Sequence, residues 1–140
     1  MPRSPPAIPA PAAHDAVHTA HQAFYEAFEA RDLDAMSDVW EHSDRVTCTH
    51  PGWPVLRGWG SVAASWMALF QGPQQLQFIL TDEHIEVAGD IAWVTVDENI
   101  LDEDDSGTVT AVNLFARSRR DGQERWLLVG HHGSSVLPRR

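Results

Sequence analysis

The sequence predicts an α+β domain in which helices come first and a meander of antiparallel strands follows. Apolar residues recur at helical spacing through the first half of the chain, as far as Gly72-Pro73, which is a strong helix stop. Beyond that pair, β-rich runs alternate with turn signals such as Ala88-Gly89-Asp90 and Asp121-Gly122. A strongly curved sheet on a layer of helices encloses a cone that is open at one end.

The composition is that of a single globular domain. The chain has 140 residues, of which 43% are hydrophobic and 21% charged, and a chain of this size can bury its own core. The net charge is −10 and every cationic side chain is an arginine. Because this balance repels phosphate backbones, we expect no nucleic-acid partner. Cys48 is the single cysteine, which excludes an intramolecular disulfide.

Residues 1–13 are rich in proline and alanine, and we expect a flexible arm there, ahead of one domain over residues 14–137. The arm lacks the apolar segment of a secretory signal. No apolar run approaches the roughly 18 residues of a membrane span. We therefore expect a cytoplasmic protein without a membrane partner.

Three helices are predicted ahead of the long strands. The first covers residues 14–30, the second is short and capped by Asp32, and the third ends at Gly72-Pro73. In each helix, apolar residues spaced three or four apart mark the face that packs inward. These residues are Val17, Ala20, Phe24, Ala27 and Phe28 in the first helix, Leu33, Met36 and Trp40 in the second, and Trp59, Val62, Trp66, Leu69 and Phe70 in the third.

A short strand is predicted between the second and third helices, over residues 44–49. It runs into the loop His50-Pro51-Gly52-Trp53. The proline and glycine indicate a tight turn, but a turn does not require the histidine and tryptophan, so we interpret this loop as the rim of a site. After the third helix, strands are predicted over residues 76–87, 91–101, 108–117 and 125–136.

This order of elements resembles the NTF2-like cone, the fold of ketosteroid isomerases, limonene-epoxide hydrolase and SnoaL-type polyketide cyclases. The resemblance covers about residues 14–137 and is carried by residues 24–34, Trp40, the His50–Trp53 loop, Arg57-Gly58 and residues 126–134. It implies three N-terminal helices packed on a strongly curved antiparallel sheet, a hydrophobic pocket, and a homodimer formed through the sheet face. The fold hosts enzymes, binding modules and assembly domains alike.

Comparison with ketosteroid isomerases suggests the first site residues. Those enzymes place a carboxylate base just before a proline in the loop after the first strand, and His50 stands at that position here. Their helix tyrosine corresponds to Phe24, and their protonated aspartic acid falls near Asn113. The resemblance therefore implies that His50 moves a proton beside a carbonyl and that Asn113 stabilises the oxyanion. The alternative for each is a purely structural hydrogen bond, for Asn113 with Glu98 or His132.

Alternation along the strands selects two further residues. With regular alternation, His132 lies on the same strand face as Trp126 and Leu128. By resemblance we expect His132, rather than His131, to face the cone. Its role there would be that of a second acid or base, or of a partner of Glu98. Glu98 is expected to be the semi-buried carboxylate of its strand. A shift of one residue in register would exchange His132 for His131 and Glu98 for Asp97.

Aromatic residues are expected to line the cone: Phe24, Trp40, Trp66 and Phe115, with Trp53 as a lid or a dimer contact. Trp40, Trp59, Trp66 and Trp93 fall on positions that are expected to face the core, so core packing is the alternative for Trp40 and Trp66. His50, His132 and Glu98 are residue types that bind metals, but they lack a local spacing signature, so we expect no metal and no cofactor.

Together these features predict a cofactor-independent isomerase, cyclase or dehydratase that acts on a small apolar molecule, cyclic or polyketide-like. The alternative is a non-catalytic ligand-binding or dimerisation module of the same fold. A homodimer is expected in either case.

Overall fold

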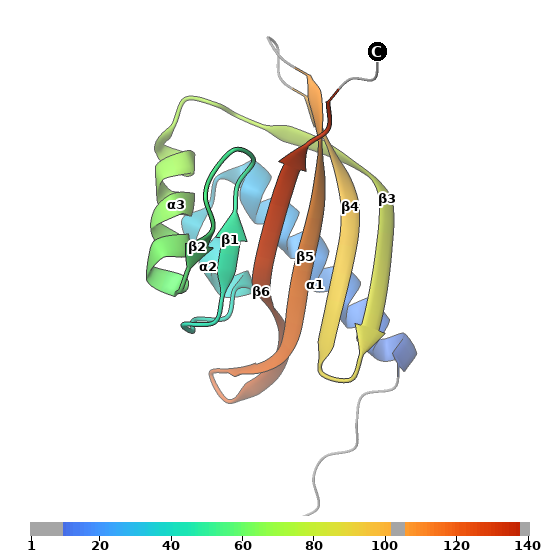
Figure 1. Ribbon diagram of the computed structural model, residues 1–140. Helices are drawn as coiled ribbons and strands as arrows, with labels where there is room; N and C mark the ends of the chain where they lie inside the picture. Colours follow the sequence, from blue (N-terminus) through green and yellow to red (C-terminus); the bar gives the residue numbers. More distant parts are fainter. Residues whose placement is uncertain (1–9, 102–105, 138–140) are drawn as a thin grey trace, which may run out of the picture.

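The computed structural model describes residues 10–101 and 106–137. Within these residues three helices and six strands follow one another as Figure 1 shows, and no helix is long and apolar enough to cross a membrane. The helices are α1 (Ala10–Ala30), α2 (Leu33–Val39) and α3 (Trp59–Gln71). The strands are β1 (Thr47–Thr49), β2 (Leu56–Arg57), β3 (Gln77–Ala88), β4 (Ile91–Leu101), β5 (Gly107–Arg120) and β6 (Gln123–Ser135).

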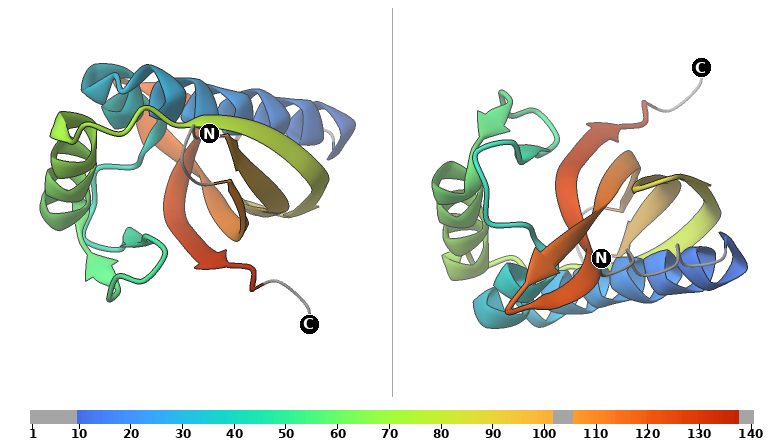
Figure 2. Two further views of the ribbon diagram at one scale, coloured as in Figure 1. Left: turned by 90° about the horizontal axis from the view of Figure 1, so that it is seen from above. Right: turned by 90° about the horizontal axis from the view of Figure 1, so that it is seen from below.

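The strands form one curved sheet in the order β2-β1-β6-β5-β4-β3. Strands β3 to β6 make the expected antiparallel meander. However, β1 pairs parallel to β6, so the sheet is mixed and not wholly antiparallel. This pairing joins Thr47–Thr49 to residues 130–132, far away along the chain, which a local sequence pattern does not reveal. Figure 2 shows α1 lying along the concave side of the sheet.

Helix α1 begins before the predicted start. Residues 10–13 of the expected arm belong to this helix, whereas residues 1–9 lie outside the described residues. Val17 and Phe24 on its inner face are fully buried. After α1, Arg31 takes a left-handed conformation (φ 52°), and the chain turns directly into α2.

Asp32 caps α2 as predicted: its Oδ1 accepts a hydrogen bond from the Ala35 amide at 3.0 Å. Asp32→Ala is expected to lower the free energy of unfolding by about 1 kcal/mol, because an orphan amide of the first turn loses its partner. Urea denaturation would measure the change. Asp34→Ala in the same turn is the control, since Asp34 does not cap the helix. An equal effect of the two substitutions would contradict the capping role.

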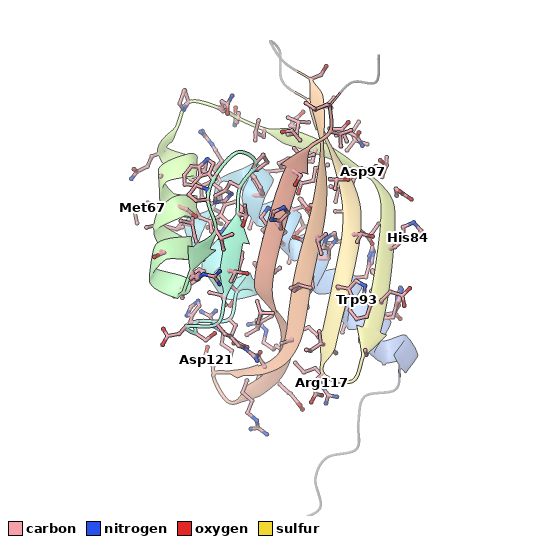
Figure 3. The ribbon with its side chains drawn as sticks, viewed as in Figure 1. Met67, His84, Trp93, Asp97, Arg117 and Asp121 are labelled. Atoms are coloured by element: carbon pink, nitrogen blue, oxygen red, sulfur yellow. The ribbon has the colours of Figure 1, made fainter. Side chains whose placement is uncertain are left out.

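The outer face of the sheet, turned away from α1, carries exposed apolar side chains (Figure 3). Trp93 of β4 is 38% exposed and pairs across the sheet with Leu114 of β5, which is 39% exposed. Ile91, two residues before Trp93, is also exposed. This face is therefore apolar near one end of β4 and β5, whereas Asp97 and His84 make it polar elsewhere.

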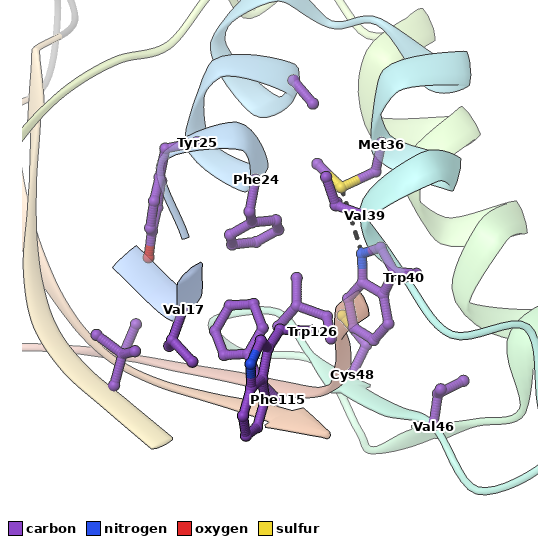
Figure 4. Packing of buried hydrophobic residues seen from close by; sticks show 14 of the residues in the cluster. Val17, Phe24, Tyr25, Met36, Val39, Trp40, Val46, Cys48, Phe115 and Trp126 are labelled. Atoms are coloured by element: carbon purple, nitrogen blue, oxygen red, sulfur yellow. Dashed lines mark hydrogen bonds between the residues drawn. The ribbon is translucent and has the colours of Figure 1, made fainter. Parts of the chain in front are cut away.

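The core lies between the helices and the concave side of the sheet (Figure 4). Trp40 donates its indole hydrogen to the Met36 sulfur, at 3.3 Å. Four aromatic residues that were expected to line an open cone are instead fully buried core residues, and they do not line the cavity described below. They are Phe24, Trp40, Trp66 and Phe115. Close edge-to-face packing, as between Phe24 and Trp66 (ring centroids 5.7 Å apart), fills this part of the cone.

Candidate functional site

A cavity of about 170 Å³ remains between α1, α3 and the sheet. Its apolar wall comes from Phe28, Leu69, Phe70, Leu76, Phe78 and Ile100. Three buried polar side chains also line it: His50, Glu98 and His131. Arg31 and Gln74 line it too and are more exposed. The site thus combines an apolar wall with a few convergent polar groups, the usual composition of a small-molecule site.

The His50-Pro51-Gly52-Trp53 loop is a tight turn at the border of this cavity. The Trp53 amide donates to the His50 carbonyl oxygen at 2.8 Å. Proline at the second position and Gly52 at the third with φ +82° are typical of a type II β-turn. The turn brings two side chains to the cavity: the rings of His50 and Trp53 meet edge to face, with centroids 5.0 Å apart.

Gly52→Ala is expected to lower the free energy of unfolding by about 1 kcal/mol, because a side chain disfavours the left-handed conformation at this position. Gly60→Ala in α3 is the matched control. A Cβ at Gly60 meets no atom within 4 Å, so this substitution should raise the stability by about 0.5 kcal/mol through helix propensity. Thermal and urea unfolding would measure both changes. Two changes of the same sign would contradict the turn assignment.

His50 is 4% exposed. Its Nε2 lies 2.9 Å from Ser65 Oγ in α3, and the Ser65 hydroxyl donates to the Val62 carbonyl oxygen at 2.7 Å. The indole of Trp66 packs perpendicular to the imidazole, with centroids 4.8 Å apart. This burial lowers the pKa of His50 to about 4, so the imidazole is neutral at pH 7 and a weaker base than the sequence predicts.

A β-bulge in β6 decides which histidine faces the cavity. Two successive residues of β5 pair with Gly130 and Leu128, so Val129 has no partner. One extra residue reverses the alternation of side chains along a strand. The buried face therefore passes from Leu128 to His131, and not to His132.

His131 takes the place that the sequence assigned to His132. It lines the cavity and is 3% exposed, and burial lowers its pKa to about 3. His132 is exposed and contacts Ser134 Oγ at 3.1 Å. The prediction that His132 faces inward was wrong because it assumed unbroken alternation along this strand.

Asn113 is fully buried, and all its polar atoms have protein partners. Its amide nitrogen lies 3.0 Å from His21 Nε2 and donates to the Tyr25 hydroxyl at 3.1 Å, and its Oδ1 lies 2.6 Å from His131 Nδ1. The amide hydrogens are thus used inside the protein. Asn113 does not line the cavity, which contradicts its predicted role as the group that stabilises an oxyanion.

Glu98 lies on the buried face of β4, as its position in the strand predicts, and lines the cavity. Its Oε2 accepts a hydrogen bond of 2.5 Å from the Tyr25 hydroxyl. Burial raises the pKa of Glu98 to about 7, although the Tyr25 hydrogen bond acts in the opposite direction. Burial and the neighbouring Glu98 charge raise the pKa of Tyr25 far above its usual value, so this hydroxyl stays protonated.

Sequence reasoning missed Tyr25 and the pair His21 and Glu83. The resemblance placed Phe24 at the position of the family's tyrosine. The next residue, Tyr25, carries a hydroxyl, but it donates this hydrogen to Glu98 and does not line the cavity. His21, fully buried, contacts a Glu83 carboxylate oxygen through Nδ1 at 3.1 Å. A polar residue on the apolar face of an amphipathic helix was the signal that could have identified His21.

The residues suggested for a metal site do not come together. His132 points away from the cavity, and within residues 10–101 and 106–137 no three His, Cys, Asp or Glu side chains are arranged to hold a metal ion. Cys48 lies near His50, with its sulfur 3.6 Å from Nε2. Burial raises the pKa of this thiol to about 12, so it is not ionised at neutral pH.

Residues 17–138 match the family described as SnoaL-like domain. An NTF2-like family protein from Streptomyces avermitilis, provisionally named a dehydratase, is 38% identical, with a TM-score of 0.80 over 90% of this chain and 97% of that chain. A protein from Thiobacillus denitrificans, provisionally named a calcium/calmodulin-dependent protein kinase type II association domain, is 31% identical, with a TM-score of 0.77 over 95% and 100%.

A curated relative comes from a plant. F-box protein SKIP8 of Arabidopsis thaliana is 30% identical over 122 residues, which is 87% of this chain. The chain spans about half, 50%, of the length of that relative.

Proposed function

The chain belongs to the family of SnoaL-like domains and has the NTF2-like α+β fold, and from this premise we propose that it is a cofactor-independent enzyme of the isomerase, cyclase or dehydratase type. It moves a proton beside a carbonyl group of a small apolar molecule, cyclic or polyketide-like. The observation that best supports the proposal is the buried Glu98 carboxyl in the wall of a largely apolar cavity. The relative provisionally named a dehydratase agrees with this reaction class.

Glu98 is the proposed proton carrier. A general acid or base is most effective when its pKa is close to the working pH, and the pKa of Glu98 is about 7. The carboxylate removes a proton from the carbon beside the carbonyl, and the resulting carboxylic acid returns it. Return to a different carbon completes an isomerisation. Transfer to a β-hydroxyl group, which leaves as water, completes a dehydration.

The other polar groups bind and orient the substrate. The pKa of His50 is about 4, so we propose that it acts as a neutral hydrogen-bonding group and not as the predicted base. His131 is proposed to act in the same way. Arg31 is proposed to hold the carbonyl oxygen and to stabilise the negative charge that develops on it. Nη1 of its guanidinium donates to the Gly72 and Gln74 carbonyl oxygens, at 2.8 and 3.4 Å. Its other N–H groups make no hydrogen bond with the residues that the structure describes.

Deuterium exchange tests the proposal without a known substrate. Single-ring cyclic ketones, with and without a β-hydroxyl group, would be incubated with the protein in D₂O and followed by NMR. We expect exchange beside the carbonyl, or loss of water, at least a hundredfold faster than in Glu98→Gln. The control Asp97→Asn alters the neighbouring carboxylate on the opposite strand face and should keep the activity. Equal rates with wild type, Glu98→Gln and buffer would refute the proposal.

The second candidate is a non-catalytic association module. It is favoured by the exposed apolar side chains of Ile91, Trp93 and Leu114 on the outer sheet face and by the relative provisionally named an association domain. We propose a homodimer through this face under either function. Native mass spectrometry should give a dimer for the wild type and a monomer for Trp93→Asp. A dimer without any exchange activity would favour this candidate, and a monomeric wild type would exclude it.

A further inference from the structure

The buried polar groups of the cavity have a common hydrogen-bonding character that identifies a class of ligand. We infer that His50, His131 and Glu98 all present acceptors to the cavity, so that its ligand is a small ring compound carrying hydroxyl groups as donors. This inference deepens the proposed function by adding hydroxyl groups to the otherwise apolar, carbonyl-bearing ring substrate. It rests on that proposal's assignment of the cavity as the substrate site.

The tautomer of His50 follows from the hydrogen bonds of Ser65. The single hydroxyl hydrogen of Ser65 is donated to the Val62 carbonyl oxygen, so at the 2.9 Å contact with His50 Nε2 the serine oxygen must accept. Nε2 therefore carries the proton of the neutral imidazole, and Nδ1 has a free lone pair. Nδ1 makes no hydrogen bond with any residue that the structure describes, and His50 lines the cavity.

The tautomer of His131 follows from Asn113 in the same way. The Tyr25 hydroxyl donates its hydrogen to Glu98, so toward Asn113 it can only accept. This orients the Asn113 amide nitrogen toward Tyr25 and its Oδ1 toward His131 Nδ1, 2.6 Å away. Nδ1 of His131 must therefore donate, and its Nε2, which has no protein partner among the described residues, is the second acceptor.

Glu98 is the third acceptor. Its Oε2 is occupied by the Tyr25 hydroxyl, while Oε1 has no hydrogen-bond partner within residues 10–101 and 106–137. When the carboxyl is ionised, both oxygens can only accept. The charged donor of the site is Arg31, at the more exposed part of the lining.

These acceptors make the cavity selective. A ligand that covers them with apolar atoms leaves buried acceptors unsatisfied, whereas hydroxyl groups satisfy them. Size sets the second limit: an apolar cavity of about 150 Å³ takes up benzene, and this cavity is about 170 Å³. A single ring with two hydroxyl groups fits both limits.

Resorcinol (1,3-dihydroxybenzene) and m-xylene (1,3-dimethylbenzene) form a matched pair of probes, because a methyl and a hydroxyl group have similar size. An NMR titration of the whole protein at pH 8 would give both dissociation constants. We expect resorcinol to bind at least tenfold more tightly. If the cavity lacked facing acceptors, m-xylene would bind more tightly, since burying a hydroxyl group without a partner is costly. That order, or equal affinities, would overturn the inference.

Ser65→Ala removes the group that holds the Nε2 proton of His50 and should lower the resorcinol preference at least threefold. Ser61→Ala, on the exposed side of the same helix, should leave the preference unchanged.

Histidine ¹⁵N spectra provide a readout that needs no turnover. The wild type should show Nε2–H for His50 and Nδ1–H for His131, and the opposite tautomers would refute the inference. Resorcinol selectivity without deuterium exchange would support the ligand class and reject the enzyme.

Discussion

Glu98→Gln is expected to raise the free energy of unfolding by roughly 3 kcal/mol at pH 8 and to change it little at pH 4. The folded pKa of about 7 lies above the ordinary value of 4.5 that holds in the unfolded chain. Stability from this group is therefore fully present below pH 4.5 and is lost as the pH rises through 7. Glutamine keeps an oxygen for the Tyr25 hydroxyl and never ionises, so it avoids this loss.

Urea denaturation at pH 4, 6 and 8 would measure the effect of Glu98→Gln. Asp97→Asn is the control, because Asp97 is the adjacent carboxylate on the opposite face of β4 and accepts from the Thr110 hydroxyl at 2.7 Å. A stability gain that is the same at pH 4 and pH 8 would contradict the assignment. The predicted gain, combined with a loss of exchange activity, would identify Glu98 as a residue that serves function at the expense of stability.

Acidification below pH 6.5 is expected to destabilise the protein through its buried histidines. The pKa of His50 is lowered to about 4 and that of His131 to about 3, against an ordinary value of 6.5. The unfolded chain therefore binds protons that the folded protein excludes, and stability present above pH 6.5 falls as the pH is lowered. Each histidine lowers the free energy of unfolding by about 1.4 kcal/mol for each unit by which the pH falls, until the pH reaches its pKa in the folded protein. Protonation of Glu98 raises the free energy of unfolding as the pH falls from 7 to 4.5, and it offsets part of this loss.

This expectation can be tested with two substitutions, each of which keeps the N–H group that the histidine donates. His50→Gln imitates Nε2–H and His131→Asn imitates Nδ1–H, and each should reduce the slope of unfolding free energy against pH by about 1.4 kcal/mol per unit between pH 6.5 and 4.5. His132→Asn removes an exposed histidine without altering the cavity and serves as the control. Identical slopes in all three variants would show that buried histidines do not cause the acid sensitivity.

Local sequence signals predicted most of the fold. The Asp32 cap, the stop at Gly72-Pro73 and the turns before β4 and β6 all depend on residues a few positions apart. The helices and long strands consequently begin and end close to their predicted bounds. The Gly52 turn is of the same kind, since its proline and glycine favour one turn type wherever the loop lies.

The sequence predicted less reliably on which face of its strand each site residue lies. Alternation alone identified Glu98, because β4 pairs with β5 without a bulge over that region. It failed for His131 and His132, because the bulge at Val129 depends on how β6 pairs with β5. Gly130, next to Val129, is a local signal for a bulge, since an isolated glycine in a strand often marks one. The sequence of β6 alone does not say which residue is left unpaired.

By itself, the sequence determined the α+β class, the order of elements, the turn that carries His50 and the burial of Glu98. The tertiary structure alone decided the mixed sheet, the inward face of His131 and the use of Asn113 within the protein. The physical reason is the range of the interactions. Caps, turns and amphipathic faces form between near neighbours, whereas Asn113 finds partners 88 and 92 residues away, in Tyr25 and His21, which only the folded chain brings together.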